Sequence, residues 1–172
     1  TYKQSMFEVD MADVSSYRSA EALFFWQKNK EIAGSPVSQW RILVAEDSRS
    51  MAEILKYFLL AGIEGADVEI ASNGKLAIER LGQQNYHLLI TDFNMPYMNG
   101  YELARQARSL NPGQAIILDT DDLTVVESSY QDKAKVAEIN RYVDVIISKD
   151  SMDNIVALAR RLLKTVVSNN SS

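Results

Sequence analysis

Cysteine is absent from this chain of 172 residues, and histidine occurs once, as His87. The lack of cysteine excludes disulfides, thiolate nucleophiles and thiolate metal sites, and one histidine cannot build a multi-histidine zinc or iron centre. The position of His87 at the start of an apolar run favours a structural role over a catalytic one. Any metal in this protein is therefore expected to be bound by oxygen ligands.

Long apolar runs and positive charge are also scarce. No segment approaches the roughly 20 uninterrupted apolar residues that span a bilayer, so we expect no membrane association and a cytoplasmic protein. The net charge of -5 gives no broad cationic field for nucleic acid, although Arg160, Arg161 and Lys164 could form a local patch. The chain begins at Thr1 rather than Met, so we expect a boundary within a longer protein.

The length accommodates one domain of about 100 to 150 residues and an appendage of about 40. We predict three parts: an N-terminal helical extension or interdomain linker over 1–38, a domain over 39–167 and a disordered tail over 168–172. A helix over about 16–33 would be stopped by Gly34 and Pro36, and its run 23–26 is too apolar to remain in water. This helix would pack on the main domain, couple to another domain or form a dimer contact, and the sequence does not choose among these.

From residue 41 on, short apolar runs alternate with amphipathic segments. The runs are too short for helices and too apolar for surface strands, so we predict buried strands over 41–45, 66–71, 87–91, 115–118 and 143–148. Apolar spacing of three and four residues predicts helices over 51–59 (with Gly62 available to end it), 75–81, 101–110, 123–140 and 155–167. The alternation predicts an α/β fold, a parallel sheet with helices on both faces that binds ligands beyond the C-terminal ends of its strands.

Polar residues follow the predicted strands at the edge where these C-terminal ends would meet. They are two acids, a third acid, a hydroxyl and an amine: Glu46 and Asp47, Asp92, Thr120, and Lys149. Taken singly, the acids could serve as helix N-caps. Crowded carboxylates, however, repel one another unless a cation lies among them, and several hard oxygen ligands suit Mg2+ or Mn2+. A carboxylate also attacks an anionic phosphoryl group only when metal and lysine offset the negative charge, so the set predicts phosphoryl chemistry.

In this order, these residues closely resemble the receiver domains of two-component response regulators, the chemotaxis response regulator among them. The resemblance covers about three quarters of the chain and rests on four pieces: Val44–Ser48 (VAEDS), Thr91–Gly100 (TDFNMPYMNG), Thr120 and Lys149. It implies a flavodoxin-like fold with strand order 2-1-3-4-5. The combination is specific, whereas any one piece alone would be weak.

The resemblance also implies a role for each residue. Asp92 would be the phosphoacceptor, and Thr120 and Lys149 would contact the phosphoryl group. The metal ligands would be Glu46, Asp47, Asp92 and the backbone carbonyl of Asn94. Met95–Pro96 and Gly100 would form the turn from the acceptor loop into the next helix. The partners implied are a histidine kinase or phosphotransfer protein, as donor, and an output domain or protein that the sequence does not identify.

Four positions depart from the family's pattern. Asp150 replaces the usual proline after the lysine, which removes the preferred route to a cis peptide there. Asp121 and Asp122 add negative charge beside the phosphoryl pocket, where a small residue is usual, and Ile146 replaces an aromatic that often reports phosphorylation. The spacing from the hydroxyl to the lysine is also several residues longer than usual, which predicts an enlarged fourth helix or preceding loop.

The leading hypothesis is a phosphorylation-controlled switch that changes a protein contact. Its enzymatic activity would be at most autocatalytic transfer of the phosphoryl group to its own Asp92, and autodephosphorylation. The departures leave open a phosphate-independent receiver used as a homodimerisation or binding module. A phosphatase of the haloacid dehalogenase type is disfavoured, because such enzymes have a second Asp two residues after the nucleophile, where this chain has Asn94.

Overall fold

The computed structural model of the chain describes residues 39–121, 138–149 and 154–170. The chain divides into two units, 1–36 and 37–172, and the described residues all belong to the second. The predicted N-terminal helix, most of the predicted helix over 123–140, and Asp122 and Asp150 lie outside the described residues. Their predictions therefore stay predictions.

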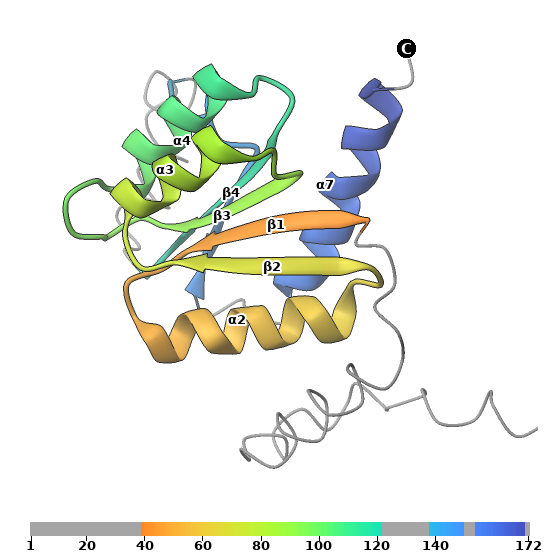
Figure 1. Cartoon of the computed structure of the whole chain (residues 1–172), viewed down its shortest axis with the longest axis horizontal. Helices are drawn as coiled ribbons and strands as arrows, with labels where there is room; N and C mark the ends of the chain where they lie inside the picture. The colour runs from red at the N-terminus through yellow and green to blue at the C-terminus, as the bar shows by residue number, and fades with distance from the viewer. Residues whose placement is uncertain (1–38, 122–137, 150–153, 171–172) are drawn as a thin grey trace, which may run out of the picture. The chain divides into compact units, whose positions relative to one another are not determined.

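Five parallel strands form one sheet in the order β2-β1-β3-β4-β5 (Figure 1). They are β1 Trp40–Ala45, β2 Ala66–Ala71, β3 Leu88–Asp92, β4 Ala115–Thr120 and β5 Val145–Ser148. The central strands β3 and β4 are buried along their whole length, which explains why their sequences show no polar alternation. The predicted fold class and strand order are confirmed.

Four helices of the described residues cover the sheet: α2 Arg49–Gly62, α3 Gly74–Gln83, α4 Gly100–Leu110 and α7 Ile155–Asn170. Figure 1 shows α3 and α4 on one face of the sheet and α2 and α7 on the other. The helix α2 ends at Gly62 as predicted, but Gly62 has a second role. A Cβ there would lie 2.4 Å from Val156 Cγ1, so the glycine permits the close approach of α2 to α7.

Alternate residues of the strands fill two apolar cores. The α2/α7 core includes Val44, Ile90, Ile117 and Ile147, whereas the α3/α4 core includes Leu43, Leu89, Ile116 and Leu118. Burial of each such side chain stabilises the fold by roughly 1.5 to 3 kcal/mol, before the loss of chain entropy is counted. Both faces of the sheet are thus fixed by packing, and in the central strands β3 and β4 the polar side chains lie only at the C-terminal ends.

Among the described elements, only β2 has the predicted bounds, and the other strands and helices differ from the predicted bounds by one to three residues. The strand β3 starts at Leu88 and includes Asp92, β4 continues to Thr120 instead of stopping at 118, and β5 starts at Val145 instead of 143. The helix α7 continues to Asn170, past its predicted end at 167. The extension of β4 matters most, because it brings an aspartate into the sheet.

The late start of β5 has a visible cause in an ion pair at the start of β4. The carboxylate of Asp144 accepts the backbone N–H of Ile116 at 2.7 Å, so a side chain takes the place of a strand hydrogen bond. Arg108 of α4 lies 3.0 Å from the same carboxylate and also donates to the carbonyls of Pro112, Gln114 and Tyr142. We call this group the Arg108 cluster.

Candidate functional site

Three carboxylates lie in one row at the C-terminal ends of the central strands. Asp92 of β3 is in register with Asp119 of β4, and Glu46 continues this row because the preceding pair is Ala45 with Thr91. Residues that are paired in a parallel sheet point to the same face. The row therefore continues the α2/α7 face of the sheet beyond its apolar part.

Glu46, Asp47 and Asp92 form the group that suits a metal ion. One oxygen from each lies within 4.8 Å of the others. Glu46 and Asp92 are 2% and 4% exposed, whereas Asp47 is exposed to solvent. The backbone N–H of Ser48 donates to Glu46 Oε1 at 3.0 Å and orients this carboxylate. Three convergent carboxylates, one of them open to water, fit the oxygen chemistry of Mg2+.

Lys149 follows β5 directly and reaches into this group. Its Nζ donates to Glu46 Oε2 at 3.0 Å and forms an ion pair with Asp92 Oδ1 at 3.2 Å. That pairing leaves Oδ1 of Asp92 without a hydrogen-bond donor of good geometry. The ammonium group thus contacts both Glu46 and the predicted phosphoacceptor Asp92, although the residue after Lys149 is not proline.

Burial sets the charge state of the site. It raises the pKa of Asp92 and of Glu46, although the Lys149 charge and, for Glu46, the Ser48 hydrogen bond oppose this. Burial acts to lower the pKa of Lys149, but its hydrogen bond to Glu46 and the Asp92 charge outweigh this and raise it. The lysine therefore stays protonated, and the site holds more acids than it has cations to neutralise them.

The loop after Asp92 is held close to the acceptor. The backbone N–H of Gly100 donates to the carbonyl of Phe93 at 2.9 Å, and a Cβ on Gly100 would lie 2.1 Å from the Asp92 carbonyl oxygen. Glycine is therefore required where α4 begins, as predicted for the turn out of the acceptor loop. Asn94 is exposed in this loop, and its backbone N–H acts to lower the pKa of Asp92. Its predicted role as a carbonyl ligand stays a prediction.

Three further residues that the sequence analysis singled out lie in or just after β4 and β5. Thr120 is fully buried as the last residue of β4, paired in register with Ser148. Ile146 lies in β5 and packs on the α3/α4 core, so an aliphatic side chain fills the place of the family's aromatic. Asp121 is exposed just after β4. The roles proposed for these residues are not decided by their positions.

Asp119 is the residue that sequence reasoning missed. It is 1% exposed, and within the described part of the chain neither of its carboxylate oxygens has a hydrogen-bond donor of good geometry. Burial raises its pKa to about 7, with the Lys149 charge opposing and the charges of Asp92 and Glu46 adding to the rise. The prediction ended β4 at Leu118 because aspartate disfavours strands. A signal was nevertheless present, since Asp119 lies between a buried run and the predicted functional Thr120.

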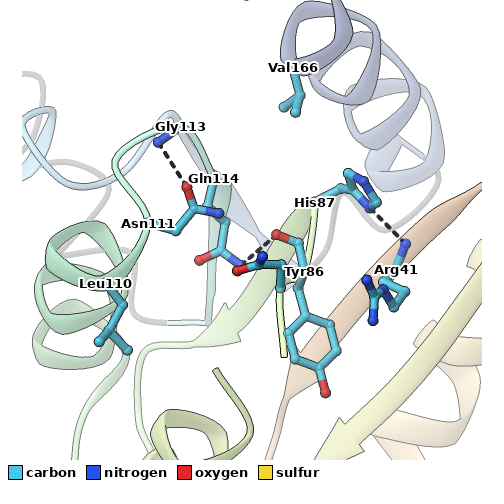
Figure 2. A pocket seen from close by; sticks show the side chains of 9 residues that line it. Arg41, Tyr86, His87, Leu110, Asn111, Gly113, Gln114 and Val166 are labelled. Atoms are coloured by element: carbon cyan, nitrogen blue, oxygen red, sulfur yellow. Dashed lines mark hydrogen bonds between the residues drawn. The ribbon is translucent and has the colours of Figure 1, made fainter. Parts of the chain in front are cut away.

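A cavity of about 460 Å³ lies at the opposite ends of the strands, among residues that precede or open them (Figure 2). Two of its polar side chains form hydrogen bonds within the protein: His87 Nδ1 accepts the backbone N–H of Arg41 at 3.0 Å, and Gln114 Nε2 donates to the Tyr86 carbonyl at 3.2 Å. No acid lines it. The cavity is therefore not the metal site, and the contact of His87 agrees with the structural role predicted for it.

No helix in the described part of the chain is long and apolar enough to cross a membrane.

The family model described as response regulator receiver domain matches residues 42–159. Among curated proteins, the chain is 36% identical over 101 residues to the response regulator receiver protein CpdR of Brucella abortus, covering 58% of this chain and 81% of CpdR. It is 43% identical over 70 residues to the sensor protein EvgS of Escherichia coli, covering 41% of this chain but 6% of EvgS. The chain thus spans most of one relative and a small part of another.

Solved structures share the fold. The response regulator TrrA of Thermotoga maritima, in complex with Mg2+ and beryllium fluoride, superposes with a TM-score of 0.59 and 29% identity, covering 72% of this chain and 99% of TrrA.

Proposed function

Because this chain belongs to the response regulator receiver domain family, we propose that it accepts a phosphoryl group on Asp92 with the help of bound Mg2+ and thereby switches a protein contact. The donor would be a histidine kinase or a phosphotransfer protein. One observation carries the proposal: Glu46, Asp47 and Asp92 converge within 4.8 Å, with Lys149 paired to two of them.

The transfer would use groups already in place. An oxygen of Asp92 attacks phosphorus, the bond from phosphorus to the donor's imidazole nitrogen breaks, and that nitrogen keeps the electron pair. Both Asp92 and the phosphoryl group are anionic, so the reaction needs positive charge at the site. Mg2+ held by Glu46, Asp47 and Asp92 would neutralise phosphoryl oxygens, with the Asn94 carbonyl as a further ligand. Lys149, 3.2 Å from Asp92 Oδ1, would supply the second cation.

The switch would depend on Thr120 and on the elements that follow it. As the buried end of β4, Thr120 is positioned to move toward a new anion at the end of the neighbouring strand. The aliphatic Ile146 removes any readout that depends on an aromatic ring at that position. We therefore propose that the readout passes through the backbone beyond β4.

The test is to incubate the chain with Mg2+ and a small phosphodonor such as acetyl phosphate, and to measure its mass. One phosphoryl group per wild-type chain is expected, and none on Asp92→Asn. The Asp121→Asn variant is a matched control, because this exposed acid lies at the same end of the sheet but outside the carboxylate group. Equal labelling of Asp92→Asn would refute the assignment of the acceptor.

A phosphate-independent binding or dimerisation module is the second candidate. The observation that favours it is the buried, unpaired Asp119, which adds negative charge next to the acceptor. This candidate predicts that Asp92→Ala keeps full partner binding or dimerisation, and that Mg2+ and phosphodonor leave the binding curve unchanged. Loss of binding in Asp92→Ala would support the phosphorylation switch instead.

A further inference from the structure

Asp119 has no part in the mechanism above, although it is one of the most buried charged residues described. It lies between Asp92 of β3 and Ile147 of β5 in one register row, so it has an acid on one side and an aliphatic side chain on the other. At 1% exposure, neither of its oxygens has a well-oriented hydrogen-bond donor among the residues that the structure describes. A buried carboxylate in this state is costly, so its surroundings need a group that compensates for it.

Lys149 is the described cation that interacts with Asp119. Its charge, together with the backbone N–H of Thr120, opposes the rise in pKa that burial causes in this carboxyl, while Asp92 and Glu46 both add to that rise. In the sheet, Lys149 comes two residues after Ile147, which is paired in register with Asp119. Lys149 lies beyond the end of β5, and its Nζ comes 3.2 Å from Oδ1 of Asp92, which is the register partner of Asp119 on the same face of the sheet. One ammonium group thus serves three buried acids, and it is bonded to only two of them.

We propose that Asp119 is a positioning residue that acts through Lys149. Its charge draws the ammonium group toward β4 and so weakens the hold of Lys149 on Asp92 and on a phosphoryl group there. This inference rests on the proposed function for its consequence, but the coupling between Asp119 and Lys149 exists in the chain without metal or phosphate. Asp119 would thereby reduce how strongly the site retains a phosphoryl group.

The first test is a double-mutant cycle on urea unfolding without metal, using the full chain, Asp119→Asn, Lys149→Met and both together. Neighbours in one ionic network are coupled, so Lys149→Met should change the unfolding equilibrium constant about tenfold more in the wild-type background than in the Asp119→Asn background. Additive effects would overturn the proposal. This readout does not depend on any phosphoryl chemistry.

The second test measures the affinity for beryllium fluoride, a phosphoryl analogue, in saturating Mg2+ by NMR titration. Asp119→Asn should bind it about tenfold more tightly than wild type, and this gain should vanish in the Lys149→Met background. The Asp121→Asn control should show little gain, because its carboxylate is exposed. A gain of equal size in the Lys149→Met background, or in Asp121→Asn, would mean a general charge effect and would overturn positioning through Lys149.

The two tests separate failure of this inference from failure of the proposed function. If wild type and every variant bind neither Mg2+ nor beryllium fluoride, the proposed function fails, and the urea cycle alone decides whether Asp119 and Lys149 are coupled. If wild type binds both and the urea cycle is additive, the proposed function stands and the role of Asp119 is refuted.

Discussion

The strand β4 carries a charged cluster at each of its ends, and the two are built in opposite ways. At its start, the Arg108 cluster gives one guanidinium four acceptors, including the carboxylate of Asp144. At its end, one ammonium group from Lys149 faces the buried acids Glu46, Asp92 and Asp119. Charge at the first end is matched and joins elements together, whereas at the second end the buried acids outnumber the described cation that pairs with them. Excess buried charge is thus the better sign of a functional site.

Removing acid from the unmatched end should stabilise the protein, and more so at high pH. The folded-state pKa of Asp119 is raised to about 7, so the folded chain binds a proton that the unfolded chain has released between about pH 4 and pH 7. Stability is then lost as pH rises through this window. Without metal, Asp119→Asn should match wild type near pH 4 and exceed it by about 2 to 4 kcal/mol near pH 8.

Urea unfolding at several pH values measures this difference. Taking the difference between the two proteins removes the contribution of His87, whose burial lowers its pKa and acts in the opposite direction. Glu46 and Asp92, whose raised pKa values act in the same direction, interact with Asp119, so their response is part of the measured difference. A difference that does not change with pH would show that Asp119 is not held in an unfavourable charged state.

Breaking the matched end should destabilise the protein at every pH. Arg108→Ala removes a cation that binds three carbonyls and a carboxylate, and should lower the free energy of unfolding by about 2 to 3 kcal/mol. Arg108→Lys keeps the charge but not the planar fork, so it should recover only part of the loss. Thermal unfolding of the variants measures this loss of stability. If Arg108→Ala were as stable as wild type, the Arg108 cluster would not stabilise the start of β4, and the contrast with the acidic end of β4 would be wrong.

Adding Mg2+ should turn the unmatched end into a matched one. At ten times its dissociation constant, a ligand that binds only the folded state stabilises it by about 1.4 kcal/mol. We expect this gain for wild type and a much smaller one for Asp47→Asn, whose exposed position leaves folding unaffected. Glu64→Gln, an exposed acid elsewhere, should keep the full gain. Calorimetric titration measures the Mg2+ affinity of each protein. An equal loss of affinity in Asp47→Asn and Glu64→Gln would contradict a Mg2+ site at Glu46, Asp47 and Asp92.

Substitutions at two glycines test packing without changing any charge, and they should change the stability least. Gly62→Ala places a methyl group against Val156 and should destabilise by about 1 kcal/mol, because α2 and α7 must move apart. Gly82→Ala meets nothing within 4 Å in α3 and should stabilise by about 0.5 to 1 kcal/mol through helix propensity. Opposite shifts of the urea midpoint are expected, and shifts of the same sign would contradict the close packing of α2 on α7.

The sequence predicted the strands and the acidic group correctly, because local patterns of residue type indicate both. Apolar runs located all five strands, and the acids and the lysine after them located the carboxylate group, because parallel strands bring their C-terminal ends together. Bonds that side chains form across the sheet could not be predicted from the sequence. The exchange of a strand hydrogen bond for the Asp144 carboxylate depends on where Arg108 of α4 lies, and nothing local in either segment indicates it.

The burial of Asp119 could not be predicted from the sequence either. Its own preference argues for a loop, yet packing of Ile117 and Ile147 on the α2/α7 core carries the strand past it and buries it. Tertiary packing here outweighs the local preference of one residue. The burial and the missing partners of that carboxylate follow from the register, which only the folded sheet defines.

The bond between Lys149 and Glu46 joins residues 103 positions apart in the chain. Such a contact closes a long loop, and it forms only after the intervening strands have assembled. Of the five strands in the described sheet, β5 comes latest in the chain, so Asp92 is synthesised before its lysine. The complete group of Glu46, Asp92 and Lys149 therefore forms only when β5 has joined the sheet, and its presence marks a folded domain.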